Sequence, residues 1–217
     1  MRYLLLVLSM LLFPLTTAHA EVRVGIGINV PGVSIGINLP AYPRLVPVPG
    51  YPVYYDPRIN SNYFFYDGLY WVFYGDGWYV SSWYNGPWDW VDRAYVPLYV
   101  LRVPVRYYRR PPPYFHGWHP DAPPRWEDRW GPGWEQHRSD WDKKDARRAA
   151  PPPAPLPSYQ RQYSGDRYPQ KVERQHELQQ QHYRYQPRDP MVQKHYEERG
   201  KGQGQGKGQD KGKGHND

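Results

Sequence analysis

The chain contains no cysteine among its 217 residues. This absence excludes disulfides, thiolate metal sites and cysteine nucleophiles, and it excludes the lipid anchor that exported lipoproteins carry on a cysteine at their cleavage site. An exported chain without disulfides must be held together by packing alone. A hydrophobic core, rather than a covalent framework, must therefore stabilise any folded part of this chain.

Long hydrophobic runs are scarce as well. Only residues 4–15, LLLVLSMLLFPL, form a sizeable apolar stretch, and it is too short to span a bilayer. It follows a basic start and precedes AHA at residues 18–20, which has the A-x-A pattern of a cleavage site. We predict a secretory signal peptide over residues 1–20, with an uncleaved N-terminal anchor as the weaker alternative. We expect no transmembrane segment after cleavage.

Recognisable catalytic motifs are missing too. The sequence has no Gly-x-Ser-x-Gly elbow, no His-Glu-x-x-His pair and no Walker A loop. Asp67, Asp76 and Asp89 fall in predicted turns, where a structural role explains them. We therefore predict no catalytic residues, no cofactor and a chain that is not an enzyme.

A metal site is also disfavoured. His116 and His119 have a spacing that can ligate a metal on a helix, and Asp121 could serve as a third ligand. Gly117 and Pro120, however, favour a solvated loop at this position. We predict no metal site.

Proline, glycine and aromatic residues are abundant instead, with 26 Pro, 20 Gly, 22 Tyr and 10 Trp. Charge is uneven, because residues 1–100 hold five Lys and Arg against six Asp and Glu, whereas residues 101–217 hold 23 against 15. The low apolar content of the C-terminal part argues against a core there. We predict four parts: a signal peptide (1–20), an aromatic-rich β domain (21–108), a Pro/Trp-rich basic extension (109–150) and a disordered low-complexity tail (151–217).

The densest aromatic segment, residues 62–91, carries regularly spaced turn signals. Asp-Gly, Gly-Asp-Gly and Asn-Gly sequences place glycines at positions 68, 77 and 86. Such sequences between β-rich runs are strong hairpin signals, because both residues tolerate positive φ. We predict an up-and-down antiparallel meander with strands at residues 63–66, 69–74, 78–84 and 88–91, and we expect Gly77 to hold a positive φ.

Rings occupy both faces of these predicted strands. A sheet with one wet face would alternate rings with polar residues, so each face is expected to meet another layer. The first interpretation is a packed core of rings, and the second is an exposed aromatic surface that binds glycans or peptides. The candidate ligand-binding residues for the second interpretation are Trp71, Trp78, Trp83, Trp88, Tyr107, Tyr108, Arg109 and Arg110.

Weaker patterns flank the meander. The repeat IGINVP and IGINLP lies in a stretch that alternates apolar residues with Gly, Ser and Asn, which predicts a hairpin over residues 22–39 that covers one face. Spaced prolines in residues 41–57 predict an extended surface connector. Residues 95–103 predict one further strand, and residues 133–148 and 170–186 predict short helices.

The basic C-terminal half predicts weak electrostatic attraction to polyanions. Rings beside arginines could stack on nucleic-acid bases, but export argues against nucleic acid as the physiological partner. We expect anionic envelope polymers or lipids, or other envelope proteins, to be contacted mainly by Arg102, Arg106, Arg109, Arg110 and the tail lysines. The alternative is a tail that only keeps an aromatic domain soluble.

Three stretches resemble a group of uncharacterised exported proteins of proteobacteria. They are GIGINVPGVSIGINLPAYPRLVPVPGYPVYY, the meander motif NYFFYDGLYWVF…WYVSSWYNGPW, and VPVRYYRRPPPYFHGW. The resemblance covers most of residues 21–142, whereas residues beyond Pro151 match only in composition. It implies a periplasmic or surface location in a Gram-negative cell, and it implies no activity, cofactor or site residue.

These features predict a mainly β fold: a small antiparallel meander or hairpin domain with extensive Pro-rich coil, a disordered C-terminal tail and one or two short helices. The leading functional interpretation is an exported, non-enzymatic cell-envelope protein of structural or interaction type. The alternative is a glycan- or peptide-binding module that uses exposed Trp and Tyr, and an envelope hydrolase is the weakest hypothesis. Burial of Trp71, Trp78 and Trp83 would favour the structural role.

Overall fold

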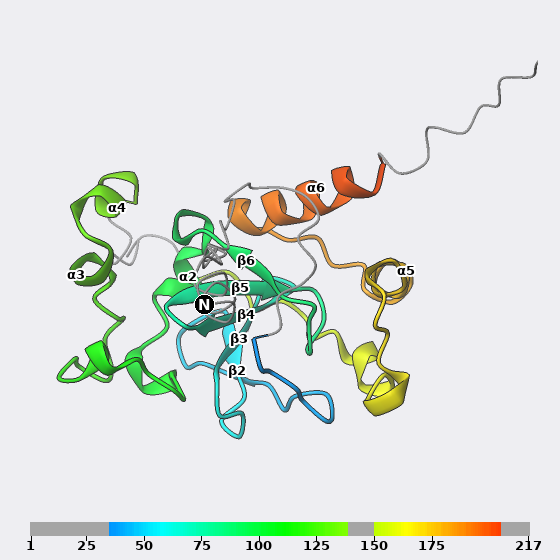
Figure 1. Cartoon of the computed structure of the whole chain (residues 1–217), viewed down its shortest axis with the longest axis horizontal. Helices are drawn as coiled ribbons and strands as arrows, with labels where there is room; N and C mark the ends of the chain where they lie inside the picture. The colour runs from blue at the N-terminus through cyan, green and yellow to red at the C-terminus, as the bar shows by residue number, and fades with distance from the viewer. Residues whose placement is uncertain (1–34, 139–149, 205–217) are drawn as a thin grey trace, which may run out of the picture.

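The computed structural model describes residues 35–138 and 150–204, and its centre is a six-stranded antiparallel sheet (Figure 1). The strands lie in the sheet in their order along the chain, so the predicted meander and the mainly β fold class are confirmed. The strands are β1 (Val46–Pro47), β2 (Val53–Tyr55), β3 (Asn62–Tyr66), β4 (Leu69–Tyr74), β5 (Gly77–Ser81) and β6 (Asp89–Val91).

Short helices surround this sheet. The α-helices are α2 (Leu98–Leu101), α3 (Trp126–Trp130), α4 (Pro132–His137), α5 (Val172–His182) and α6 (Pro190–Gly204). The 3₁₀ helices are η2 (Arg93–Tyr95), η3 (Val105–Tyr107), η4 (Pro113–Phe115), η5 (Ser158–Gln162) and η6 (Gly165–Arg167). Within residues 35–138 and 150–204, no helix is long and apolar enough to cross a membrane.

Both central hairpins have two-residue turns. Asp67 and Gly68 join β3 to β4 with φ of 50° and 92°, and Gly75 and Asp76 join β4 to β5 with φ of 54° and 66°. Two consecutive positive φ values match the right-handed twist of the flanking strands. The expectation for Gly77 is wrong, because the positive φ values fall on the two residues before it and Gly77 already belongs to β5.

The predicted alternation of side chains along the strands is confirmed. In β4, Leu69, Trp71 and Phe73 belong to one buried cluster, whereas Tyr70 and Val72 belong to another. Directly paired residues of neighbouring strands share a face, so each face carries a continuous layer of rings. We refer to the side of Trp71 as the first face and to the side of Tyr70 as the second face.

The first face is covered by the segment that directly follows β6. This segment contributes the buried side chains Val96, Val100, Leu101, Val103, Tyr108, Phe115, Trp126 and Trp134. Figure 1 shows α3 and α4, which carry the two tryptophans, on one side of the sheet and α5 on the other. The Pro/Trp-rich extension is therefore part of the core and not an appendage to it.

The second face is covered from both sides of the sequence. Ile35 and Leu45 come from the N-terminal side, and Ala154, Tyr168 and Leu178 come from residues 150–197, which we name the strap. The last part of the strap passes the β3–β4 turn and reaches the first face, where Val192 is buried.

The strap overturns part of the sequence prediction. Residues 151–217 were expected to be disordered, yet the strap folds into η5, η6, α5 and the start of α6 and packs on the sheet. Tyr and Gln side chains fill the contact that aliphatic residues would otherwise make, so low aliphatic content did not imply disorder here. Residues 205–217 lie outside the described residues.

Several flanking expectations also change. Residues 35–39 form no strand, and the first copy of the repeat lies outside the described residues. The proline-rich connector supplies β1 and β2, because its prolines lie outside the strands or, as Pro47, in the edge strand where a missing N–H is tolerated. Within residues 95–103, helix α2 replaces the predicted strand. The helix predicted at residues 170–186 is confirmed as α5.

Candidate functional site

The tryptophans proposed from the sequence as a binding surface lie inside the protein. Trp71 and Trp83 have exposed fractions of 0%, Trp78 of 1%, Trp88 of 3% and Tyr108 of 4%. A ligand cannot stack on rings that are enclosed by other side chains. These five residues therefore belong to the core, and the first interpretation of the aromatic segment is the one that the structure supports.

The remaining predicted contact residues stay near the surface. Tyr107 is half-buried, with its ring centroid 5.0 Å from that of Tyr55, and the side chains of Arg109 and Arg110 are exposed. The main chain of Arg110 is fixed by Asn62, which accepts from its N–H at 2.8 Å and donates to its carbonyl oxygen at 2.7 Å. These residues form an exposed basic corner.

The wider basic set predicted for anion contact is not a single surface. Arg102 is only 8% exposed, so its burial removes it from the predicted set. Arg106 is exposed but lies 2.5 Å from a carboxylate oxygen of Asp121. Of the four arginines expected to act together, Arg102 is buried and Arg106 is paired, so only Arg109 and Arg110 remain as an exposed pair.

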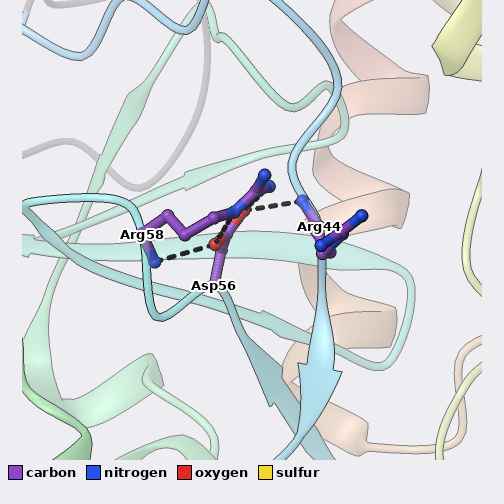
Figure 2. A network of polar contacts seen from close by, with 3 residues as sticks. All are labelled: Arg44, Asp56 and Arg58. Carbon is purple, nitrogen blue, oxygen red and sulfur yellow. Dashed lines mark hydrogen bonds and ion pairs between the residues drawn. The ribbon is translucent and has the colours of Figure 1, made fainter.

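Asp56 is the most enclosed carboxylate of the sheet domain, at 2% exposed. Its Oδ2 accepts from the Arg44 main-chain N–H at 2.6 Å and from Arg58 Nη2 at 2.9 Å, and its Oδ1 accepts from Arg58 N and Nε (Figure 2). Burial raises the pKa of this carboxyl, but the hydrogen bonds from Arg58 and Arg44 outweigh burial and lower the pKa overall. With both oxygens occupied, Asp56 pins the chain after β2 to the chain before β1.

Asp67, in the β3–β4 turn, holds the strap. Its Oδ1 accepts from the Tyr185 hydroxyl at 2.6 Å, and its Oδ2 accepts from the N–H groups of Arg188 at 2.9 Å and Asp189 at 2.8 Å. Burial raises the pKa of Asp67 by more than these hydrogen bonds lower it. The carboxylate is therefore a docking point for the strap.

Asp76, in the β4–β5 turn, holds the segment that covers the first face, as Asp67 holds the strap. It accepts hydrogen bonds from the Tyr114 hydroxyl at 2.5 Å and from Arg129, whose guanidinium carbon lies 5.0 Å from the Tyr114 ring centroid. Burial raises the pKa of Asp76, but the bonds from Arg129 and Tyr114 lower it further, so the net shift is downward. This carboxylate ties the first-face cover to the hairpin.

The two histidines considered for metal binding lie in a loop, as expected. His116 and His119 are both exposed, and His119 Nδ1 accepts from the Asp121 N–H at 3.2 Å. In the part of the chain that the structure describes, no group of three or more His, Cys, Asp and Glu side chains is placed to hold a metal ion.

Exposed rings gather instead at one end of the sheet. Tyr74 is 49% exposed and Trp90 is 42% exposed, whereas most rings of the sheet are buried. The register pairs Tyr74 with Gly77 and Tyr79 with Trp90, so these four residues share the second face. We name them the open aromatic face, because the strap covers a different part of this face.

Gly77 shapes the open aromatic face. A Cβ atom at this position would lie 3.5 Å from Trp90 Nε1 and 3.5 Å from Tyr79 Cε2. Both distances are ordinary van der Waals contacts, so the Gly77 backbone lies directly against the Trp90 indole and the Tyr79 ring. The open aromatic face thus combines two half-exposed rings, Tyr74 and Trp90, with the half-buried ring of Tyr79.

Sequence reasoning missed this face, although one signal for it exists. Tyr74 and Trp90 are the last and middle residues of their strands, at the end of the sheet that lies far from the Trp83 and Tyr84 cluster. Alternation alone places Tyr74 on the second face, but it cannot say where along that face the covering segments stop.

A second surface feature lies on the strap. An open hollow of about 500 Å³ is lined by Gln162, Tyr163, Arg167, Pro169, Arg174 and Leu178. Arg174 Nη1 already donates to Glu177 at 3.0 Å. The hollow therefore offers less specific chemistry than the open aromatic face.

In comparisons with known proteins, no family model, no curated protein and no solved structure matches this chain. Its function must therefore be inferred from the placement of its own residues.

Proposed function

We propose that this chain is an exported, non-enzymatic protein of the Gram-negative cell envelope that acts by binding, and that the open aromatic face contacts a neutral glycan. The observation that carries the proposal is the exposure of Tyr74 and Trp90 side by side with Tyr79, in a protein whose other sheet rings are mostly internal. Export itself rests on the signal-peptide pattern of residues 1–20.

A non-enzymatic role is supported by the use of the acidic side chains. Asp56, Asp67 and Asp76 each accept hydrogen bonds from other parts of the same chain. Carboxylates engaged in this way hold segments of the chain together. Their positions in loops and turns fit structural roles.

A glycan is favoured over a polyanion because of what surrounds the exposed rings. Tyr and Trp present a large apolar area with a polar edge, which suits the apolar faces and hydroxyl groups of sugar rings. The strands β4, β5 and β6, which carry these rings, contain no Lys or Arg, and the nearby Arg129 is paired with Asp76. The exposed arginines Arg109 and Arg110 lie elsewhere in the chain and make an anionic polymer the second candidate.

The proposal is tested by binding of the mature protein to neutral envelope polysaccharide and to lipopolysaccharide across a salt series. We expect binding to the neutral glycan that persists at high salt, because ring stacking is not screened by ions. Trp90→Ala should weaken this binding at least tenfold, and Tyr74→Ala should weaken it by a smaller factor.

The matched control is Val172→Ala, which removes an exposed hydrophobic side chain at 46% exposure from α5. This variant should bind like the wild type. Binding that occurs only to lipopolysaccharide, fades with salt and is insensitive to Trp90→Ala would replace the glycan proposal with the anionic one. Binding to neither polymer would leave only a structural role.

A further inference from the structure

The rings of the open aromatic face have a spacing that the sheet imposes. Tyr74 ends β4 and pairs with Gly77, which begins β5, whereas Trp90 lies on the next strand, β6. Neighbouring strands are about 4.8 Å apart, so Gly77 lies one strand spacing from Tyr74, and β6 lies one spacing further in the same direction. Gly77 therefore separates two half-exposed rings that come from the strands on either side of it.

The Trp90 indole brings its ring close to the row that Tyr74 and Gly77 form. Trp90 pairs with Tyr79, which lies two residues beyond Gly77 along β5. A Cβ atom on Gly77 would nevertheless lie 3.5 Å from Trp90 Nε1, so the polar edge of the indole faces the bare Gly77 main chain. Within residues 35–138 and 150–204, this N–H donates to no other group, and it is available to a ligand hydroxyl.

Polar groups border the Tyr74 end of this row. The register pairs Asn62 with Phe73, and its continuation by one residue places Ser61 opposite Tyr74. Asn60 is exposed, and its carbonyl oxygen accepts from the Ser61 hydroxyl at 2.8 Å. The Asn60 amide and the Ser61 oxygen supply donors and acceptors of the kind that sugar hydroxyls pair with.

A ring, a gap and a second ring match an extended polysaccharide with β-1,4 linkages. Each unit of such a chain is rotated by half a turn relative to its neighbours, so every second unit presents the same ring face to a surface. One unit is about as long as one strand spacing, roughly 4.8 Å. Units that stack on Tyr74 and on Trp90 are then separated by one unit, which crosses the sheet at Gly77, where no side chain stands in its way.

We propose that the open aromatic face binds an internal stretch of an extended, neutral, β-1,4-linked hexose polymer, with one unit on Tyr74, the next over Gly77 and the third on Trp90. The inference rests on the proposed function and narrows it to one linkage class and to three consecutive units. A disaccharide reaches only one of the two rings. An α-1,4-linked chain coils away from a flat sheet and loses the second ring for the same reason.

The test measures the affinity of the full mature chain for neutral glucose oligomers of increasing length by isothermal titration calorimetry. The β-1,4-linked and the α-1,4-linked series contain the same sugar and differ only in linkage. We expect the affinity for the β-linked series to rise at least fivefold from the disaccharide to the tetrasaccharide and to change little with further units. The α-linked series should show no such rise.

Two variants locate the three units. Tyr74→Ala should reduce the affinity for the β-linked tetrasaccharide to that for the disaccharide, because only the Trp90 ring remains. Gly77→Val places a branched side chain between the rings and should lower the affinity for the tetrasaccharide at least fivefold. The matched control is Val172→Ala, whose exposed side chain lies on α5 and which should keep the full length dependence.

The outcomes separate this inference from the proposed function on which it rests. Binding that depends on Trp90 but shows no rise with length, or that is equally tight for the α-linked series, overturns the inference and leaves the proposed function standing. A length dependence that survives in Tyr74→Ala also overturns it. Binding of neither the oligomers nor neutral envelope polysaccharide overturns both.

Discussion

The two faces of the sheet are covered in different ways. The first face receives a continuous segment, residues 92–137, whose buried contacts are mainly Val, Leu, Phe and Trp. The second face receives residues from both sides of the sheet sequence, and its strap makes buried contacts through Gln160, Gln175 and Gln179 as well as tyrosines. One cover is held by apolar area, and the other is held largely by hydrogen bonds.

Because of this difference, the first face mainly stabilises the fold, whereas the second face mainly determines which segment covers it. Apolar burial is non-directional and scales with area, so the first face contributes most to the free energy of folding. A hydrogen bond adds little net free energy, but a buried group left without a partner costs much more. The second face therefore specifies which segment covers it, and we expect it to open at a lower free energy than the first.

The largest expected effect is on the first face. Trp126 is 0% exposed, stacks on Trp130 at 4.3 Å and donates from Nε1 to the Leu101 carbonyl at 2.9 Å. Trp126→Ala should lower the free energy of unfolding by about 3–5 kcal/mol, as is typical for a buried tryptophan. Chemical denaturation of the mature protein measures this. A loss below about 1 kcal/mol would show that the first face is not the main stabilising layer.

The next effect concerns the second face. Gln160→Leu removes the hydrogen bonds of Gln160 with the Tyr84 N–H, the Tyr70 hydroxyl and the Ser82 carbonyl, which should cost roughly 2–3 kcal/mol. We expect the substitution to lower the free energy needed to detach the strap. Hydrogen exchange should then become faster in α5 and residues 82–88, whereas β3 to β5 should stay as protected as in the wild type. Equal loss of protection in strap and sheet would show that the two faces unfold as one unit. Gln162→Leu should leave both unchanged.

A turn substitution probes the hairpin that both faces share. Gly75→Val places a β-branched residue at φ 54°, which should cost roughly 1–2 kcal/mol of whole-domain stability. Gly77→Ala is the matched control, because its new Cβ would meet Trp90 and Tyr79 at an ordinary contact distance of 3.5 Å. Thermal unfolding of the two variants compares them, and equal melting temperatures would contradict the turn geometry.

The smallest expected effects are on the pH dependence of stability. This dependence should have opposite signs for Asp76, on the first-face side, and Asp67, which holds the strap. Asp76, whose pKa is lowered, contributes stability that is present above its unfolded pKa and is lost as pH falls through its folded pKa. Asp67, whose pKa is raised, binds an extra proton in the folded state, so strap docking weakens as pH rises through its folded pKa. Acidification should therefore weaken the contact of Asp76 with the first-face cover and strengthen the contact of Asp67 with the strap.

Asparagine substitutions measure these two contributions. Asp76→Asn should lower the free energy of unfolding by about 1 kcal/mol or less at neutral pH, because the ion pair with Arg129 is exposed. In acid, where Asp76 is protonated, the substitution should have no effect. Asp67→Asn keeps an oxygen for the Arg188 and Asp189 N–H groups and an amide for the Tyr185 hydroxyl, so it should dock the strap at least as well at neutral pH. Hydrogen exchange across the acid range compares each variant with the wild type. Parallel pH dependences for the two variants would contradict the opposite pKa shifts.

The strands and turns of residues 62–91 were predictable because their signals are local. Asp67-Gly68 fixes a turn by backbone conformation alone, and alternation then assigns each neighbouring ring to a face. The same alternation correctly separated Trp71 from Tyr70. Local rules therefore specified strands β3 to β6, their order and the two aromatic layers, whereas β1 and β2 were not predicted.

The covers were not predictable, because their signals lie far away in the sequence. Nothing in the neighbourhood of Gln160 or Gln175 indicates that each will meet a main-chain group more than 70 residues earlier. The binding surface was misplaced for the same reason, since only the extent of the covers distinguishes buried Trp83 from exposed Trp90. Composition alone predicts that truncation after Ala150 leaves the fold intact. Because Tyr168 and Leu178 are buried on the second face, we expect instead that truncation destabilises it.

The outer strands of the sheet have a consequence for self-assembly into fibrils. β1 contains two residues, one of them Pro47 without an N–H group, and β6 contains three. Short edges and edge prolines leave few main-chain groups for another strand to pair with, which is how natural β proteins avoid templated aggregation. A chain with 22 Tyr and 10 Trp would otherwise be a candidate for amyloid-like stacking. The sheet of one molecule should therefore be a poor template for the strands of another, even at high protein concentration.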